Sequence, residues 1–217
     1  MKIVAVIPTK DEEEGIRHVL RELKPIVKEI IVVDSSSDKT PEIAKKMGAT
    51  VIAEERKGYG RAYKTGFSNI PKDADVIVTL DADGTYPVDV IPKLVKMLED
   101  ENLDFISCAR QYSGVMSAKH KLGNFILTIT SNILFFNRIA DSQTGMWVFR
   151  PSVLDKIDVK SDGMPFSEEI KIRVIRAGLK FREIPVSYGE RIGEVKLDSF
   201  RDGFKNLFYL FRLRFGL

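Results

Sequence analysis

Two aspartates, Asp81 and Asp83, are separated by one residue and come directly after a strongly apolar run, and Gly84 follows them. Carboxylates at positions i and i+2 of a turn can converge on one hard divalent cation, since Mg²⁺ and Mn²⁺ prefer oxygen ligands. Such a cation can bridge the oxygens of a diphosphate and neutralise it as a leaving group. The alternative is a pair of solvated turn aspartates, because aspartate is common in turns. The pattern makes Asp81 and Asp83 candidate metal ligands.

A third carboxylate, Asp34, ends another apolar run and is followed by three serines. Its oxygens can accept hydrogen bonds from a nucleobase N–H or from ribose hydroxyls. The alternative is that Asp34 or Asp38 caps the next helix, which is a common role for aspartate. We assign the cap to Asp38 and a ligand role to Asp34.

A basic loop with two glycines, residues 56–62, opens a further predicted helix. Such a loop can approach phosphate groups closely, helped by the N-terminus of the helix. Taken alone, two glycines fit an ordinary loop equally well. Cys108 is the only cysteine, which excludes an internal disulfide framework, and its apolar surroundings predict that it is buried. His18 and His120 have no partner pattern, so neither is expected to be catalytic.

The elements that must position these side chains alternate between short apolar runs and amphipathic segments, which is typical of a mostly parallel sheet with helices on both faces. The predicted strands are 2–7, 29–33, 50–53, 75–80 and 104–109, followed by 146–149 and 179–185. The predicted helices are 12–27, 40–46, 61–67, 88–99, 117–136, 167–177 and 197–215. In such sheets ligands bind beyond the carboxyl ends of the strands. The three aspartates therefore belong to one edge of an α/β fold.

Several motifs together resemble family 2 glycosyltransferases. Segments 8–12, 33–40, 57–62 and 81–83 occur in the order expected of that family. Segments 109–112, 141–146 and 188–197 look like those of dolichyl- or polyprenyl-phosphate mannose and glucose synthases. The resemblance covers about residues 2–197. It implies the GT-A fold, with a catalytic domain over 1–196 and a C-terminal basic amphipathic helix over 197–217.

The resemblance also implies roles for individual residues. The nucleotide pocket would be lined by Pro8, Glu12 and Asp34, and the diphosphate and its Mg²⁺ or Mn²⁺ ion would face Asp81, Ala82 and Asp83. Phosphates of donor or acceptor would contact Arg110, Arg191 and Lys196, since guanidinium groups match phosphate bidentately. The catalytic set would be Asp83, Asp141 and Arg191.

A phosphate acceptor carries negative charge at neutral pH, so it needs less help from a general base than a sugar hydroxyl does. The main tasks are then screening the repulsion between two phosphates and stabilising the leaving group. Asp141 is the candidate for orienting the acceptor or acting as base, with helix capping as the alternative. For Glu168 and Glu169 a solvated or capping charge is the favoured interpretation. The resemblance implies inversion at the anomeric carbon.

Two apolar stripes at helical spacing predict contact with a membrane surface. The first contains Leu122, Phe125, Ile126, Ile129, Ile133 and Phe136, and the second contains Leu197, Phe200, Phe204, Leu207, Phe208, Phe211 and Phe215. The alternative is packing against the domain or against a homodimer partner. No signal peptide and no run of about 18 apolar residues is visible, so we expect a peripheral protein on the cytoplasmic face. A net charge of +3 gives no reason to expect a nucleic-acid partner.

The leading hypothesis is transfer of a hexose from GDP-mannose or UDP-glucose to dolichyl or another polyprenyl phosphate. A second is a soluble transferase acting on a small hydroxyl acceptor. A third is a non-catalytic nucleotide-sugar-binding module, against which stands the presence of both Asp81 and Asp83.

Overall fold

The strands form one mixed sheet in the order β3-β2-β1-β4-β6-β5-β7. The computed structural model describes residues 1–55, 58–112, 118–194 and 199–216. The strands are β1 (Ile3–Thr9), β2 (Glu29–Asp34), β3 (Thr50–Ala53), β4 (Val76–Thr79), β5 (Phe105–Tyr112), β6 (Trp147–Phe149) and β7 (Phe181–Tyr188). Only β6 runs antiparallel to its neighbours β4 and β5, so the prediction of a mostly parallel sheet is confirmed.

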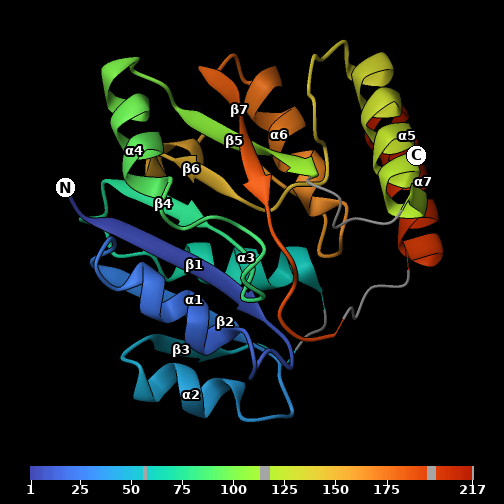
Figure 1. Cartoon of the computed structure of the whole chain (residues 1–217). Coiled ribbons are helices and arrows are strands. Elements are labelled where there is room, and N and C mark those ends of the chain that lie inside the picture. Colours follow the sequence, from blue (N-terminus) through green and yellow to red (C-terminus); the bar gives the residue numbers. More distant parts are fainter. Residues whose placement is uncertain (56–57, 113–117, 195–198, 217) are drawn as a thin grey trace.

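This topology brings seven chain segments to one edge of the sheet. The carboxyl ends of β1, β2, β3, β4, β5 and β7 all point the same way, and the antiparallel β6 begins there. Each segment that leaves a parallel strand, and the loop that enters β6, therefore meets the others at that edge (Figure 1). A ligand bound at this edge can therefore contact residues that are far apart in the sequence.

Helices cover both faces of the sheet (Figure 1). They are α1 (Ile16–Leu23), α2 (Thr40–Lys46), α3 (Tyr59–Ser68), α4 (Ile91–Asp100), α5 (Ala118–Phe135), α6 (Phe166–Arg176) and α7 (Ser199–Phe215), with a short 3-10 turn at Pro151–Val153. Apolar side chains that alternate along the strands face α1, α2 and α4 on one side and α3 and α6 on the other. Both faces are buried, which is why the central strands read as unbroken apolar runs.

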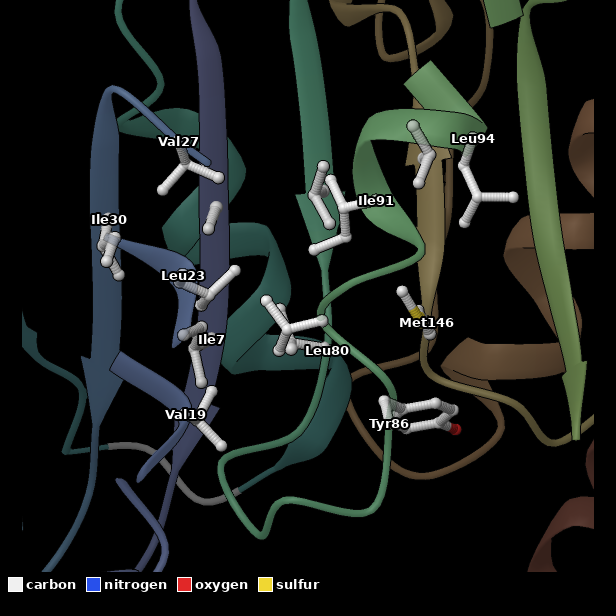
Figure 2. Close-up of a cluster of buried hydrophobic side chains, with 14 of the residues drawn as sticks. Ile7, Val19, Leu23, Val27, Ile30, Leu80, Tyr86, Ile91, Leu94 and Met146 are labelled. Atoms are coloured by element: carbon white, nitrogen blue, oxygen red, sulfur yellow. The ribbon is translucent and has the colours of Figure 1, made fainter. Parts of the chain in front are cut away.

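The core on the α1 side shows how sequence periodicity produces this packing. The helix α1 buries Ile16, Val19, Leu20 and Leu23, which recur at the i, i+3, i+4 and i+7 spacing of one helical face. Figure 2 shows Val19 and Leu23 packed beside Ile7 of β1, with Leu80, Tyr86 and Met146 in the same cluster. The strand that leads to the Asp81–Asp83 pair is thus anchored in the core up to its last residue.

The helices α5 and α7 lie side by side, outside the two layers that cover the sheet (Figure 1). They share a small apolar cluster with α6 that contains Leu127, Phe135, Ile172 and Leu210. One face of this helix pair therefore packs on the domain.

Most predicted boundaries agree with the structure to within two residues. The helix predicted over 12–27 is shorter in the structure, because residues 13–15 form a turn, and α1 begins at Ile16 and ends at Leu23. The fourth helix begins at Ile91 and not after Pro87, because the segment that follows β4 first makes the turn that presents Asp81 and Asp83.

Candidate active site

The ends of β1 and β2 hold the first part of the site. Thr9 and Asp34 are partners in the strand register, and Thr9 Oγ1 donates a hydrogen bond to Asp34 Oδ1 at 2.7 Å. Ser36 Oγ donates to the same oxygen at 2.6 Å. Pro8 precedes Thr9 and is half-buried, so the structure brings Pro8 and Asp34 to the same two strand ends. Asp38 Oδ1 accepts the backbone N–H of Thr40 at 2.9 Å and the Thr40 hydroxyl at 2.5 Å, and Thr40 is the first residue of α2. The residue at the N-cap position itself is Lys39.

The turn after β4 presents Asp81, Ala82 and Asp83. The side chain of Asp83 is 1% exposed, and its Oδ1 accepts the backbone N–H of Thr85 at 3.0 Å and the Thr85 hydroxyl at 2.6 Å. Gly84 has a φ of 75°, in the left-handed region that glycine adopts without strain. Ala82 is buried beneath this turn. The local hydrogen bonds fix Asp83 without engaging its second carboxylate oxygen.

Arg191 supplies the partner for that oxygen. Its Nη1 lies 2.8 Å from Asp83 Oδ2, and its Nη2 lies 2.7 Å from Glu12 Oε1. The backbone N–H of Ile192 donates to the Asp83 carbonyl at 2.8 Å, which holds the segment after β7 against the turn after β4. The Nε atom of Arg191 is buried and has no hydrogen-bond partner among the described residues. The Arg191 guanidinium therefore joins two of the predicted site carboxylates, and its buried Nε–H can still donate to a ligand.

Asp81 has a different environment from Asp83. The Tyr59 hydroxyl donates a long hydrogen bond to Asp81 Oδ1 at 3.4 Å. Burial, followed by the negative charge of Asp83, raises the pKa of Asp81 to about 7, although Arg191 and Arg110 act in the opposite direction. The two carboxylates thus carry more negative charge than the surrounding groups balance.

A divalent cation fits this pair of carboxylates. Asp83 Oδ2 is buried and makes an ion pair, but accepts no well-directed hydrogen bond among the described residues, while burial and the charge of Asp83 raise the pKa of Asp81. Mg²⁺ is commonly held by one or two carboxylates together with substrate phosphates, and a cage made only of protein ligands is not required. No group of three His, Cys, Asp or Glu side chains among the described residues has the arrangement of such a cage.

A second charged pair lies at the end of β5. Arg110 contacts Asp141 through two parallel hydrogen bonds, Nε to Oδ2 at 2.7 Å and Nη2 to Oδ1 at 2.9 Å. Both side chains are less than 10% exposed. Burial of Asp141 raises its pKa, but the charge and hydrogen bonds of Arg110 outweigh burial and hold the pKa below its usual value. This geometry suits Asp141 to holding the guanidinium and not to accepting a proton.

Aromatic side chains connect the two charged clusters. The guanidinium of Arg110 lies 5.4 Å from the ring centre of Tyr188 at the end of β7. The Tyr188 ring packs edge-on against Tyr86, whose hydroxyl accepts the backbone N–H of Gly145 at 2.8 Å. Together these contacts place the loop that enters β6 beside the turn that carries Asp81 and Asp83.

The loop from Asp141 to Gly145 rests on a buried lysine. The Lys171 ammonium donates to the Asp141 carbonyl at 2.9 Å, and its side chain is 0% exposed. Burial lowers the pKa of Lys171 to about 8, with Asp141 and Glu183 opposing the shift. A buried cation thus lies directly behind the pair formed by Arg110 and Asp141.

The expectation of solvated charges at Glu168 and Glu169 is wrong, because α6 packs its N-terminal turn into the domain and both side chains are 0% exposed. Glu169 accepts the backbone N–H of Ser161 at 2.8 Å and the Tyr209 hydroxyl at 2.6 Å. Burial raises the pKa of Glu168 to about 8. Lys196, the remaining predicted site residue, lies outside the described residues.

The residues that sequence reasoning missed are Tyr59, Tyr86, Gln143 and Lys171. A lysine within an amphipathic helix normally indicates the solvent face, so no local pattern predicts the burial of Lys171. Tyr59 and Tyr63 stand four residues apart, and this spacing does indicate that the two rings share one face of a helix.

The two predicted apolar stripes are exposed. In α5 the exposed side chains are Leu122, Phe125, Ile126, Ile129 and Ile133, and Phe136 follows the helix with 85% exposure. In α7 they are Phe204, Phe208, Phe211 and Phe215. The members Leu197 and Phe200 lie outside the described side chains. Leu207 is the exception, because it is partly buried and packs on the apolar cluster that α5, α6 and α7 share. The other described members of the stripes do not pack into the core, since their large apolar side chains are left uncovered. None of the described helices combines the length and hydropathy of a membrane span.

Comparison with known proteins gives matches along the chain. The family model described as Glycosyl transferase family 2 matches residues 4–158. The chain is 35% identical over 206 residues to a dolichyl-phosphate hexose transferase of Haloferax volcanii, covering 93% of this chain and 89% of the relative. It is 34% identical to the low-salt glycan biosynthesis hexosyltransferase of the same organism, covering 94% of this chain, but it spans only about half (52%) of that relative's length.

Two further matches extend the comparison. An undecaprenyl-phosphate mannosyltransferase of Micrococcus luteus is 27% identical, with 92% of this chain and 88% of the relative covered. Glucosyl-3-phosphoglycerate synthase of Mycobacterium tuberculosis superposes with a TM-score of 0.80 at 20% identity, covering 100% of this chain and 80% of that chain. At this identity the superposition shows a shared fold, which confirms the predicted GT-A architecture.

Proposed function

Since the chain belongs to glycosyl transferase family 2, we propose that it transfers a hexose from a nucleotide sugar to a polyprenyl phosphate at a membrane surface. Two relatives with 27% and 35% identity carry the names of transferases to undecaprenyl and dolichyl phosphate, which supports this class of acceptor. GDP-mannose and UDP-glucose are the donors to test first.

One observation carries the proposal. Arg110 and its partner Asp141 lie at a loop that contacts α5 and α7, the two helices that expose large apolar side chains. Thr128 of α5 hydrogen-bonds to Ser142 at 3.1 Å, so α5 contacts the same loop that fixes Arg110. A lipid phosphate has both features that this arrangement matches, a charged head for a guanidinium and an apolar tail for exposed helices.

The proposed donor end of the site is the edge formed by β1, β2 and β4. Asp34 would accept hydrogen bonds from the nucleoside, and Asp81 and Asp83 would hold Mg²⁺ or Mn²⁺ against the diphosphate. When bound, that ion would neutralise the charge that develops on the leaving nucleoside diphosphate. Solved structures of the glucosyl-3-phosphoglycerate synthase contain Mn²⁺ with UDP, which supports a divalent cation as the partner of the donor diphosphate.

In the proposed reaction an acceptor phosphate oxygen attacks the anomeric carbon while the bond to the diphosphate breaks. Arg110 would bring the acceptor phosphate close to the donor in spite of like charges, and Asp141 keeps its guanidinium oriented. The unpaired Nε of Arg191 would donate to a phosphate oxygen as the bond breaks. Attack from the face opposite the leaving group inverts the anomeric configuration.

The C-terminal segment 197–217 would bind the membrane. Within it, α7 carries Lys205, Arg212 and Arg214 on exposed positions next to its exposed phenylalanines. Basic and aromatic residues on one helix favour the interface of an anionic lipid surface. Residues 1–196 would form the catalytic domain.

The proposal is tested by a screen of donors and acceptors. The donors are GDP-mannose, UDP-glucose and the two nucleotide sugars with the bases exchanged, GDP-glucose and UDP-mannose. Each is supplied with Mg²⁺ or Mn²⁺ and with a polyprenyl phosphate in lipid vesicles. Parallel reactions contain 3-phosphoglycerate or free hexose as hydroxyl acceptors. Transfer to the lipid phosphate alone is the expected result. Transfer only to a hydroxyl acceptor, or no transfer from any nucleotide sugar, would overturn the assignment.

A further inference from the structure

Helix α7 presents two different faces, and one of them reaches the loop that holds Arg110. Asn206 is 4% exposed, whereas Phe204 and Phe208, two residues away on either side, are 71% and 66% exposed. Two residues correspond to about 200° around a helix, so Asn206 points away from the phenylalanines. An amide thus faces the domain beneath a surface of exposed aromatic rings.

The Asn206 amide makes a direct contact with the acceptor-side loop. Its Nδ2 donates a hydrogen bond to Gln143 Oε1 at 2.9 Å. Gln143 Nε2 in turn donates to Glu168 Oε2 at 2.8 Å and to Ser142 Oγ at 2.9 Å. The side chain of Gln143 is therefore held from three directions, and α7 supplies one of them.

The Gln143 backbone continues the chain of contacts toward the reacting groups. Its N–H donates to Asp141 Oδ1 at 3.0 Å, the same oxygen that accepts Nη2 of Arg110. A continuous series of hydrogen bonds thus runs from α7 through Gln143 and Asp141 to Arg110. The buried lysine Lys171 holds the same loop through its carbonyls, so the loop has fixed partners on α6 and α7 alike.

We propose that Asn206 and Gln143 are positioning residues that couple the seating of α7 on a lipid surface to the orientation of Arg110 toward the acceptor phosphate. This inference rests on the proposed function, because it assigns Arg110 to a lipid-borne acceptor. Asn206 and Gln143 touch neither substrate. They act by holding the loop whose carboxylate fixes the guanidinium, so they affect binding of the acceptor and not of the donor.

Packing of α7 alone provides the matched control. Leu210 lies one turn beyond Asn206, is 0% exposed, and belongs to the apolar cluster shared with α5 and α6. Leu210→Ala weakens the attachment of α7 but leaves every hydrogen bond of Gln143 in place. Asn206→Leu removes the amide, and Asn206→Asp preserves the side-chain volume while replacing the donor by an acceptor.

The experiment measures steady-state transfer to a polyprenyl phosphate in anionic vesicles, together with binding of the nucleoside diphosphate and Mn²⁺ by calorimetry. Asn206→Leu, Asn206→Asp and Gln143→Leu should each raise the acceptor KM about tenfold, the effect of losing one well-formed hydrogen bond. The nucleotide Kd should stay unchanged. The double variant Asn206→Leu with Gln143→Leu should be no worse than Gln143→Leu, since the two side chains act in series.

The controls separate the positioning role of Asn206 and Gln143 from the proposed transferase function. Leu210→Ala should lower the Tm without raising the acceptor KM. An acceptor KM within twofold of wild type in both Asn206 variants would overturn the positioning role while leaving the proposed function standing. An equal rise in Leu210→Ala would overturn it too, because loss of packing would then suffice. A wild-type protein with no activity toward the lipid phosphate would overturn both.

Discussion

Arg191 lies 2.8 Å from Asp83, and this ion pair joins the segment after the last strand to the turn after the fourth strand. The same guanidinium contacts Glu12 after the first strand. Three regions that are far apart in sequence thus share one cation. Because Asp83 makes an ion pair with Arg191 and Asp81 makes none among the described residues, the pair is suited to a further cation supplied with a diphosphate.

Asp83→Asn should reduce kcat by at least about a hundredfold, since it removes the carboxylate proposed to hold the cation at the leaving group. The fold should persist, because the remaining carbonyl oxygen still accepts the bonds from Thr85. Transfer rates and Tm measure the two effects. Asp89→Asn is the control, since Asp89 is an exposed aspartate on the same connection. Near-normal turnover in Asp83→Asn would remove Asp83 from the mechanism.

Gly15→Ala should impair activity by disturbing the Asp81–Asp83 turn from behind. A Cβ atom at Gly15 would clash with the Ala82 carbonyl oxygen and lie 3.0 Å from Asp83 Cα. We expect at least a tenfold loss of kcat/KM, about 1.4 kcal/mol. Gly123→Ala in α5 is the control, because nothing lies within 4 Å of its added Cβ. It should keep activity and gain up to about 1 kcal/mol in stability. Full activity in Gly15→Ala would contradict this close approach.

The sequence predicted the strands and the edge of the sheet because both depend on local patterns. The strands were predicted from apolar runs, and the predicted strand 50–53 has the same first and last residues as β3 (Thr50–Ala53). Cys108 is buried, as its apolar surroundings predicted. The rule for carboxyl ends brought Asp34 and Asp83 to one edge. The contact between Arg191 and Asp83 depends on tertiary packing, which no local pattern encodes. Lys171 was missed for the same reason, since its burial is set by the loop that covers it.

Asp141→Asn should raise the KM for the acceptor by about tenfold or more while the KM for the donor stays unchanged. The change removes the charge that orients Arg110, and breaking a buried ion pair should also cost about 3–5 kcal/mol of stability. Steady-state kinetics and urea unfolding measure the two effects. Glu101→Gln is the control, because it breaks the exposed ion pair between Arg182 and Glu101. Loss of this pair should lower the free energy of unfolding by no more than about 1 kcal/mol.

The same variant distinguishes two roles for Asp141. A positioning role predicts a change in acceptor KM. A general base would instead lower kcat at constant KM and remove the acidic limb of the pH–rate profile. That second outcome would contradict the assignment drawn from the bidentate contact with Arg110.

Glu168→Gln should change how stability depends on pH. The pKa of Glu168 is about 8 in the folded protein, against 4.5 for an ordinary glutamate, so between these values the folded protein retains a proton that the unfolded chain releases. The free energy of unfolding of the wild type should therefore fall as pH rises from 4.5 to 8. Glutamine cannot ionise, so the variant should lose this contribution to the slope and exceed the wild type by about 4 kcal/mol at pH 8.

Urea unfolding at pH 5.5 and pH 8 tests this sign. Glu99→Gln is the control, because Glu99 is exposed on α4 and its replacement should leave the slope unchanged. An identical pH slope in wild type and Glu168→Gln would show that Glu168 is ionised within the fold. Lys171 has its own window above pH 8, where its lowered pKa makes stability rise with pH. Asp81, whose pKa is raised to about 7, gives a slope of the same sign as Glu168 below pH 7. Because Asp81 is present in both proteins, the difference in slope between wild type and Glu168→Gln reports Glu168.

Phe204→Ser combined with Phe208→Ser should weaken binding to anionic vesicles by at least about tenfold, because burial of a phenylalanine contributes about 1.5–3 kcal/mol. The two rings are exposed, so their removal should leave Tm and nucleotide binding unchanged. Vesicle co-sedimentation measures the change, and Lys45→Ser with Lys46→Ser in α2, a basic pair far from α7, controls for nonspecific charge effects (Figure 1). If the double phenylalanine variant bound vesicles as wild type does, the exposed rings would have to face another protein surface, and the lipid would not be their partner.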